Sequence, residues 1–398
     1  MNAKNPLSRR GFVGGVATAL GALTLSPEAA RAAGVLAAQG HGTPRDRGAT
    51  DDYDGYAKLA SNENPYGPPE SVMRAMTDAF KYSNRYAYPD GKIVEEIARH
   101  HGVSPDHILL GAGSGELLSI TALALLEGGR KVVGVDPTFM TVYQFAAGVH
   151  ADSIRVPLLP DHRQDISAMV STTRANWKEI GLVYLCNPNN PTGRIVTAAE
   201  VQALLDGIPG DIPVLVDEAY HHFVNDPAYA TSIPYVLQGR PVIVTRTFSK
   251  IAALAGMRLG YAVAPPTLIE RLKPHSIGSI NAIVKWGGVA ALRDTESQAR
   301  VKRVTIELRE STTRELRAMG YDVIPSEANF FMVQLGRPVP PVIDEFKAKG
   351  VLVGRPFPPM NTHLRVSVGT PEEMQRFLVA FRDIFPAQAR SSGEAGSR

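Results

Sequence analysis

Short apolar stretches alternate with amphipathic stretches along residues 81–264. The apolar stretches predict strands at 131–135, 154–158, 181–186, 213–216, 241–245 and 259–264. Helical spacing occurs between several of them: apolar residues within 93–98 share one helix face, and Thr197 with Glu200 forms a capping box. Strands that are apolar throughout and that alternate with helices favour a largely parallel sheet covered by helices on both faces.

The pattern changes after Ile283. A long charged helix is predicted at 298–319, and Pro371 opens a last helix whose apolar residues lie on one face. Between these helices, strands are predicted at 329–335, 351–353 and 363–368. The pattern therefore indicates a smaller α+β domain after the α/β region.

Composition narrows the class of protein. The 398-residue chain has 44% hydrophobic and 20% charged side chains, which excludes a disordered chain, a collagen-like repeat and a polytopic membrane protein. The net charge of +3 is too small to indicate a nucleic-acid partner. Cys186 is the only cysteine, so an internal disulfide and a multi-cysteine metal site are also excluded.

The first 32 residues have the pattern of a secretory signal. Arg9 and Arg10 precede an apolar run at 13–25, and Ala30-Arg31-Ala32 forms a small-residue cleavage site. The paired arginines resemble a twin-arginine (Tat) signal, which implies the Tat export machinery as a partner and a periplasmic or extracytoplasmic location. The location is cytoplasmic if the signal is not used, and a disordered basic tail is the alternative interpretation. The apolar run is too short for a stable membrane span.

Lys250 is the sharpest candidate for chemistry. It directly follows a predicted strand, with hydroxyl groups at Thr247 and Ser249 and a guanidinium group at Arg258. A lysine amine in this setting suits a Schiff base to an aldehyde whose phosphate group the neighbouring side chains hold. For these residues alone, a solvated Ser-Lys pair is the alternative.

Three other motifs follow apolar stretches. Asp217, in Asp-Glu-Ala-Tyr, lies where open α/β sheets bind ligands and could pair with a protonated pyridine nitrogen. Asn190, in Asn-Pro-Asn-Asn-Pro-Thr-Gly, could donate its amide to a ring phenolate. The Gly-rich residues 111–116 lead into a predicted helix N-terminus, which can bind an anion. A capping aspartate and plain turns are the alternatives.

Together these segments resemble the pyridoxal-phosphate (PLP) aminotransferases of class I and II, and most closely their histidinol-phosphate aminotransferase branch. The resemblance covers residues 57–385 and includes the late Leu-Arg-Val-Ser-Val-Gly-Thr and the opening Asn-Glu-Asn-Pro-Tyr-Gly. It implies the α/β fold of the fold type I PLP-dependent transferases. The domain limits that we predict are a signal peptide at 1–32, a flexible lead at 33–56, a segment joining the small domain at 57–80, a large PLP-binding domain at 81–295, a small domain at 296–386 and a disordered tail at 387–398.

The resemblance also implies a role for each motif residue. Lys250 forms the covalent link to PLP and shuttles the proton, and Asp217 pairs with the pyridine nitrogen. The side chains that contact the ring are Phe139, Asn190 and Tyr220. The groups that hold the phosphate are Ser114, Gly115, Ser249 and Arg258. Tyr88 reaches the phosphate bound by the partner subunit of a homodimer. The substrate contacts are Tyr66, Arg355 and Arg365, of which the last clamps the α-carboxylate.

The implied reaction is ping-pong transamination between an amino donor, an L-amino acid or amine, and a 2-oxo acid. A PLP-dependent decarboxylase or cyclising enzyme of the same fold is the alternative, and a non-catalytic PLP-binding sensor is a third hypothesis. Gly115 and Phe139 stand where this family often has Asp and Tyr. The donor therefore stays open among histidinol phosphate, an aromatic amino acid and a specialised-metabolite amine. We expect no metal, because the adjacent histidines at 100–101 and 221–222 should point to different faces.

Overall fold

The computed structural model describes residues 53–86 and 89–385. The predicted signal peptide, most of the predicted lead, Tyr88 and the whole predicted tail lie outside these residues. Among the helices that the structure describes, none combines the length and the apolar character needed to cross a membrane.

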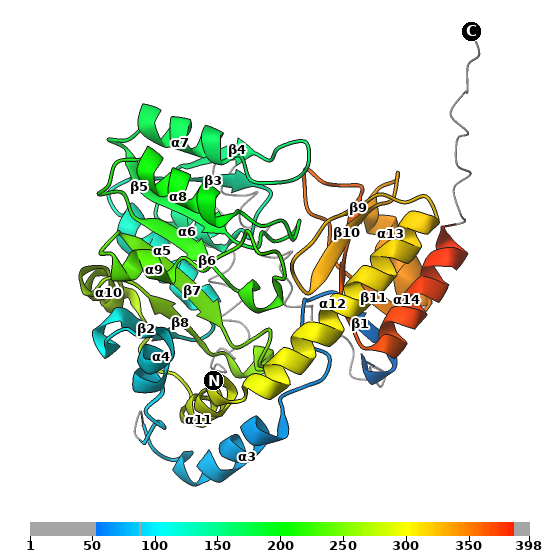
Figure 1. Cartoon of the computed structure of the whole chain (residues 1–398), viewed down its shortest axis with the longest axis horizontal. Helices are drawn as coiled ribbons and strands as arrows, with labels where there is room; N and C mark the ends of the chain where they lie inside the picture. Colours follow the sequence, from blue (N-terminus) through cyan, green and yellow to red (C-terminus); the bar gives the residue numbers. More distant parts are fainter. Residues whose placement is uncertain (1–52, 87–88, 386–398) are drawn as a thin grey trace, which may run out of the picture. The chain divides into compact units, whose positions relative to one another are not determined.

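A seven-stranded sheet lies at the centre of the larger part of the molecule, with the strand order β2-β8-β7-β6-β5-β3-β4 (Figure 1). Its strands are β2 (Ile108–Gly111), β3 (Lys131–Asp136), β4 (Ser153–Pro157), β5 (Ile180–Cys186), β6 (Val214–Asp217), β7 (Val242–Thr247) and β8 (Gly260–Val263). Only β8 runs against its neighbours. The predicted α/β fold with a largely parallel sheet is confirmed, and each strand predicted in this region lies within two residues of its predicted ends.

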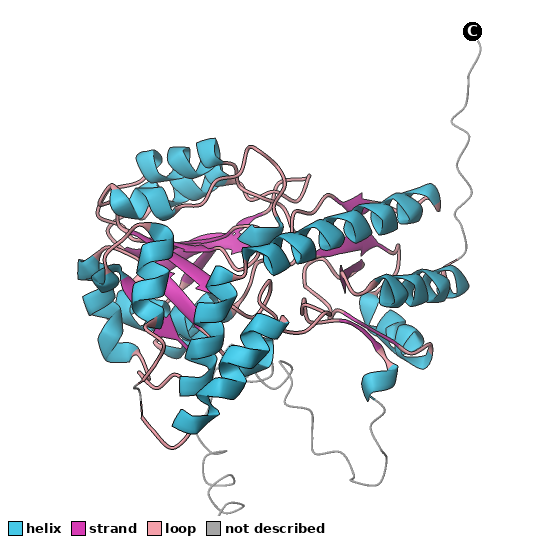
Figure 2. Ribbon diagram, turned by 60° about the horizontal axis from the view of Figure 1, so that its bottom comes forward, coloured by secondary structure: helices cyan, strands magenta, loops and turns pink. Residues whose placement is uncertain are grey.

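Helices cover both faces of this sheet (Figure 2). The helices of this part are α3 (Glu70–Ala79), α4 (Ile93–His101), α5 (Ser114–Leu126), α6 (Thr141–Gly148), α7 (Ile166–Ala175), α8 (Ala198–Gly207), α9 (Ile233–Leu237), α10 (Pro266–Leu272) and α11 (Ala282–Arg293). Successive residues of a strand point to opposite faces. In β6, accordingly, Val214 and Val216 belong to one apolar cluster and Leu215 to the other. The predicted capping box of Thr197 and Glu200 begins α8.

The C-terminal residues, together with residues 57–59, form two smaller sheets. One pairs β1 (Ala57–Leu59) in parallel with β11 (Val351–Val353), and the other has the antiparallel order β12-β10-β9. The remaining elements are β9 (Val323–Ile324), β10 (Phe330–Gln334), β12 (His363–Ser367), α12 (Thr295–Ala318), α13 (Val339–Ala348) and α14 (Pro371–Ile384). A separate apolar cluster, rich in phenylalanine, fills the space between them. The three strands and two helices predicted here are confirmed, whereas β1 and β9 were not predicted.

The central sheet brings distant segments of the chain together. Strands β3, β5, β6 and β7 are parallel neighbours, so their carboxyl ends meet at one edge of the sheet. The loops that begin there carry Phe139, Asn190, Tyr220 and Lys250. This edge is where open α/β sheets bind ligands.

Candidate active site

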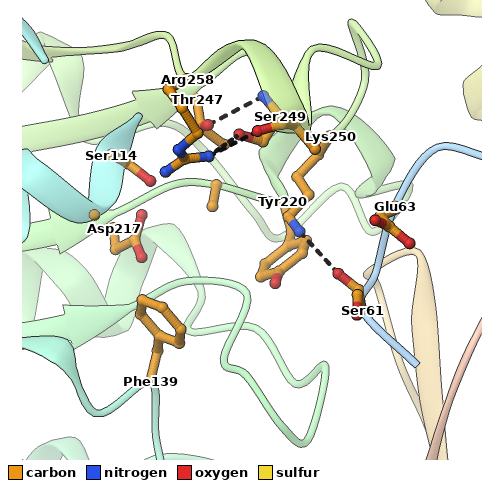
Figure 3. A pocket seen from close by; sticks show the side chains of 13 residues that line it. Ser61, Glu63, Ser114, Phe139, Asp217, Tyr220, Thr247, Ser249, Lys250 and Arg258 are labelled. Carbon is orange, nitrogen blue, oxygen red and sulfur yellow. Dashed lines mark hydrogen bonds between the residues drawn. The ribbon is translucent and has the colours of Figure 1, made fainter. Parts of the chain in front are cut away.

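A cavity of about 300 Å³ lies at this edge of the sheet (Figure 3). Its volume is at the lower end of the range typical of small-molecule sites. Eight of the residues predicted from the sequence line it: Ser114, Gly115, Phe139, Asp217, Tyr220, Ser249, Lys250 and Arg258. The structure therefore gathers in one place side chains that the sequence separates widely.

Lys250 lies on the loop after β7, and its amine points into the cavity (Figure 3). Nζ donates a hydrogen bond to the backbone oxygen of Ser61 at 3.2 Å and lies 5.6 Å from the ring centre of Tyr220. Burial lowers the pKa of Lys250 to about 8, Arg365 adds to this effect, and Glu63 opposes it. The neutral fraction near neutral pH is therefore larger than that of an ordinary lysine, which favours a role as nucleophile or base.

Asp217 is the last residue of β6, and only 2% of it is exposed. The hydroxyl group of Thr245 donates to its Oδ1 at 3.2 Å. Burial raises the pKa of Asp217 to about 6. A carboxylate buried in this way is stabilised by a cation placed against it.

A cradle for an anion lies beside these two residues. It is formed by Ser114 at the start of α5 and by the guanidinium group of Arg258, which donates to Ser249 Oγ at 3.4 Å and to the Ala112 oxygen at 3.2 Å. Arg258 has no carboxylate partner among the described residues. A Cβ atom at Gly113, which has φ +80°, would overlap that guanidinium group. Helix N–H groups and an unpaired guanidinium group together bind anions well.

Arg365 forms a second positively charged group on β12, with 7% exposed. Its Nη1 donates to Asn190 Oδ1 at 2.8 Å and its Nη2 to the Ala60 oxygen at 2.6 Å, whereas Nε has no partner. Burial lowers the pKa of Arg365 to about 10. Within residues 53–86 and 89–385 no carboxylate pairs with it, so this buried cation lacks a counter-ion.

Asn190 is connected to the cavity by its hydrogen bond to Tyr220. Its Nδ2 donates to the hydroxyl group of Tyr220 at 3.4 Å, but it does not line the cavity itself. The other asparagines of the loop hold the backbone: Asn187 exchanges hydrogen bonds with Val196, and Asn189 donates to the Pro137 oxygen. Only the third asparagine is therefore available to the site.

Two of the predicted substrate residues, Tyr66 and Arg355, do not line the cavity that contains Lys250. Tyr66 lines a separate cavity of about 220 Å³ beside Arg300. Arg355 is exposed, and its guanidinium carbon lies 4.3 Å from the ring centre of Phe357, a ring that Arg365 approaches to 4.7 Å. Their contacts with substrate stay predictions, as does the role of Tyr88, which lies outside the described residues.

Residues 60–62 contribute to the site through contacts that their sequence does not predict. The backbone oxygens of Ala60 and Ser61 accept hydrogen bonds from Arg365 and Lys250, and Asn62 Nδ2 donates to Tyr220 at 3.1 Å. In the sequence, the Asn-Glu-Asn motif indicates only the family branch. Backbone contacts between segments so far apart leave no signal in residue spacing.

The expectation that adjacent histidines point to different faces was wrong for one pair. His221 and His222 lie on a short 3₁₀ turn, η4 (His221–Phe223), and their ring centres are 3.7 Å apart. The rings of His100 and His101 are also close, at 4.7 Å. The rings of His221 and His222 therefore do not point to different faces. In the part of the chain that the structure describes, no group of three or more His, Cys, Asp or Glu residues is arranged to hold a metal ion.

The family model for aminotransferase class I and II matches residues 54–381. The chain belongs to this family. It is 37% identical over 336 residues to a histidinol-phosphate aminotransferase of Moorella thermoacetica, an alignment that covers 82% of this chain and 85% of the relative. It is 36% identical over 332 residues to an aromatic amino acid aminotransferase of Rhodococcus jostii, with 82% and 89% covered.

A comparison with solved structures also finds an aminotransferase. The histidinol-phosphate aminotransferase of Sinorhizobium meliloti in complex with pyridoxal-5'-phosphate matches with a TM-score of 0.75 at 26% identity, covering 86% of this chain and 98% of that one. This class I and II aminotransferase is thus a PLP-dependent enzyme of fold type I.

The residues of the cavity fit PLP on three observations. The anion cradle at Ser114 and Arg258 suits a phosphate group, and the glycine at 113 leaves it open. Asp217 is a buried carboxylate suited to a protonated pyridine nitrogen, and Lys250 has a lowered pKa suited to an aldehyde. Phe139 faces the cavity from its other side (Figure 3).

Proposed function

We propose that this aminotransferase transfers the amino group of an L-amino acid or amine to a 2-oxo acid, with a donor like those of its relatives: histidinol phosphate or an aromatic amino acid. The observation that carries the proposal is the buried, unpaired guanidinium group of Arg365 beside the Lys250 cavity. An anion bound there supplies the missing counter-ion. The α-carboxylate of an amino acid, or the phosphate ester that histidinol phosphate carries in its place, provides one.

Each residue then has a defined task. When bound, PLP supplies an aldehyde that joins the amine and a ring that accepts electron density. Lys250 Nζ would take the proton from the substrate α-carbon and deliver it to the former aldehyde carbon of the cofactor, and Asp217 would hold the proton of the pyridine nitrogen. The ring is contacted by Phe139, Asn190 and Tyr220. The phosphate is held by Ser114, Gly115, Ser249 and Arg258. Arg355 is available to a second anion, and Tyr66 is the other proposed substrate contact, from the separate cavity that it lines.

A screen of donors on the PLP-loaded enzyme tests the proposal. Histidinol phosphate, phenylalanine and tyrosine are each mixed with the enzyme in a single turnover, followed by addition of 2-oxoglutarate. We expect at least one donor to remove the visible absorbance of the bound cofactor, and 2-oxoglutarate to restore it. Release of carbon dioxide, with no change in the cofactor after turnover, would contradict transamination.

The proposal includes a homodimer in which Tyr88 reaches the phosphate site of the partner subunit. The family resemblance supports it. Sedimentation of the loaded enzyme measures the assembly, and a fully active monomer would remove the proposed role of Tyr88.

The proposal also includes export. Residues 1–32 act as a twin-arginine signal, and the enzyme is periplasmic or extracytoplasmic; it is cytoplasmic if the signal is not used. The Tat route carries folded proteins, so the enzyme can acquire PLP before export. Fractionation of cells that express the full chain tests this, and an uncleaved, cytoplasmic product argues against it.

A further inference from the structure

The hydroxyl group of Tyr220 receives two hydrogen bonds from amides. Asn62 Nδ2 lies 3.1 Å from the phenolic oxygen, and Asn190 Nδ2 lies 3.4 Å from it. A phenolic hydroxyl group has room for two such donors and keeps one hydrogen of its own to donate. With both acceptor positions occupied, that hydrogen has to find an acceptor elsewhere.

The orientation of the Asn190 amide follows from its other contact. Asn190 Oδ1 accepts a hydrogen bond from Arg365 Nη1 at 2.8 Å. A guanidinium group can only donate, so the oxygen of this amide faces Arg365 and its nitrogen faces Tyr220. The contact with Tyr220 is therefore a donation by Asn190.

The orientation of the Asn62 amide follows in the same way. Ser367 Oγ accepts the backbone N–H of Asn62 at 2.8 Å and donates to Asn62 Oδ1 at 2.8 Å. If the amide were reversed, the hydroxyl hydrogen of Ser367 would lose its only acceptor among the described residues. The amide nitrogen of Asn62 therefore also faces Tyr220.

Asn62 is firmly held in this position. It is 1% exposed, and its backbone oxygen accepts from Asn329 Nδ2 at 3.1 Å. Its φ of 53° is left-handed, a conformation that Asn and Asp adopt more readily than other residues with a side chain. Ser367 lies on β12, and Asn329 directly precedes β10 of the same small sheet. Asn62 therefore links this sheet to Tyr220, which follows β6 of the central sheet.

We infer that Asn62 is a positioning residue: together with Asn190 it fills both acceptor positions of the Tyr220 hydroxyl group, and so directs the hydrogen of that group into the cavity toward the ring oxygen of the cofactor. The inference rests on the proposed contact between Tyr220 and that oxygen. Burial raises the pKa of Tyr220, so the hydroxyl group keeps its hydrogen.

This arrangement has a measurable consequence in the loaded enzyme. A hydrogen bond donated to the negative ring oxygen draws charge away from the adjacent Lys250 nitrogen, and a proton on that nitrogen becomes easier to lose. The pH midpoint at which the visible absorbance of the bound cofactor changes is therefore lowered. Loss of the directed hydrogen bond should raise this midpoint.

Asn62→Asp reverses the contact with little change in shape. Asp tolerates the left-handed backbone, and its carboxylate accepts the hydrogen of Tyr220 and turns it out of the cavity. We expect the midpoint of the PLP-loaded variant to rise by roughly one to two pH units, the size of a hydrogen bond to a charged group. Tyr220→Phe should shift the midpoint in the same direction.

The matched control is Asn62→Asp in the Tyr220→Phe background. If the effect passes through the Tyr220 hydroxyl group, the second substitution adds almost no shift there. An equal shift in both backgrounds means that the new charge acts directly, and it overturns the inference, as does no shift in the single variant. An unchanged midpoint in Tyr220→Phe alone instead refutes the proposed contact of Tyr220 with the cofactor.

A second variant covers the case in which Asn62→Asp does not fold. Ser367→Ala removes the group that fixes the Asn62 amide but leaves the amide in place. We expect a smaller rise of the same midpoint, again absent in the Tyr220→Phe background. No rise with intact Tyr220 contradicts the inference.

Discussion

Asp217 is a carboxylic acid whose burial is costly when the cofactor is absent. Burial raises its pKa from 3.8 to about 6. The folded state holds this proton more tightly than the unfolded chain, so the stabilisation by the protonated acid is present below about pH 4 and is lost as the pH rises through about 6. A shift of about two pKa units corresponds to about 3 kcal/mol of unfolding free energy.

We therefore expect Asp217→Asn to stabilise the cofactor-free enzyme. Its unfolding free energy should equal that of the unsubstituted protein near about pH 4 and exceed it by up to about 3 kcal/mol above about pH 7. The PLP-loaded variant should lose most of its turnover. Urea titrations across this pH range measure the difference, with Asp211→Asn at an exposed position as the control. A variant that is less stable at neutral pH would show that Asp217 is not strained in the empty site.

Arg355 should distinguish doubly from singly anionic substrates. It has no carboxylate partner among the described residues and shares the ring of Phe357 with Arg365. A charge-assisted hydrogen bond contributes about 1.5–3 kcal/mol, so Arg355→Ala should lower kcat/KM for 2-oxoglutarate, which carries a second carboxylate, by about 10- to 150-fold. The half-reaction with phenylalanine should change by less than about threefold.

Steady-state kinetics with each substrate measure this difference, and Arg300→Ala beside Tyr66 is a control in the other cavity. If Arg355→Ala affects all substrates equally, its role is structural. If Arg300→Ala alone reduces the use of 2-oxoglutarate, the second carboxylate binds beside Tyr66.

Much of the site was predictable at this scale because its chemistry is carried by short motifs. Lys250 and Asp217 were found from residue type and from their position after a strand, and both line the cavity. Asn62 and Ser61 were not found, because they act through contacts that only the folded chain creates. Residue type alone also could not show that Tyr66 and Lys250 line different cavities.

Among the elements, α4, η4 and β7 bring histidines together around a buried ion pair. Arg246 of β7 pairs with Glu218 at 2.8 Å. Burial, and then the positive charge of Arg246, keep the pKa values of His101, His221 and His222 below the ordinary value. His101 also bonds the hydroxyl group of Tyr261 on β8 at 2.9 Å. The unfolded chain binds protons at these positions below about pH 6.5, but the folded protein does not.

The unfolding free energy should therefore fall as the pH decreases from about 6.5 to about 5, by up to about 1.4 kcal/mol per pH unit for each neutral histidine. Replacing both His221 and His222 by Asn should reduce this slope by up to about 3 kcal/mol per pH unit, whatever the variant does to stability at neutral pH. Denaturant titrations at several pH values measure the slope. An unchanged slope in the double variant would mean that the pair is already protonated in the folded state.

The elements themselves were predictable where the pattern is local. Continuously apolar runs located β3 to β8, and the spacing of apolar residues located α12 and α14. Strands β1 and β9 were missed because they are short and depend on pairing with distant partners, as Ala57 does with Val351. The antiparallel direction of β8 was equally invisible, since a buried strand is apolar in either direction.

For the whole molecule, the proposed homodimer makes a prediction about mixed assemblies. If Tyr88 completes the site of the partner subunit, a dimer of one Lys250→Ala subunit and one Tyr88→Ala subunit contains one site with both residues intact and one site with neither. If Tyr88 serves its own subunit, no site in that dimer is intact. Each variant should have little activity by itself in both cases.

We therefore expect activity to appear when the two inactive variants are unfolded together, mixed in equal amounts and refolded with PLP. Random pairing makes half of the dimers mixed, and one of their two sites is intact, so the mixture should reach about a quarter of the unsubstituted activity. Two Lys250→Ala preparations, one of them tagged, are the control for exchange without complementation. Recovery of activity needs both a dimer and a Tyr88 that acts in the partner's site. If subunits exchange but activity does not recover, the protein is a dimer in which Tyr88 acts in the site of its own subunit.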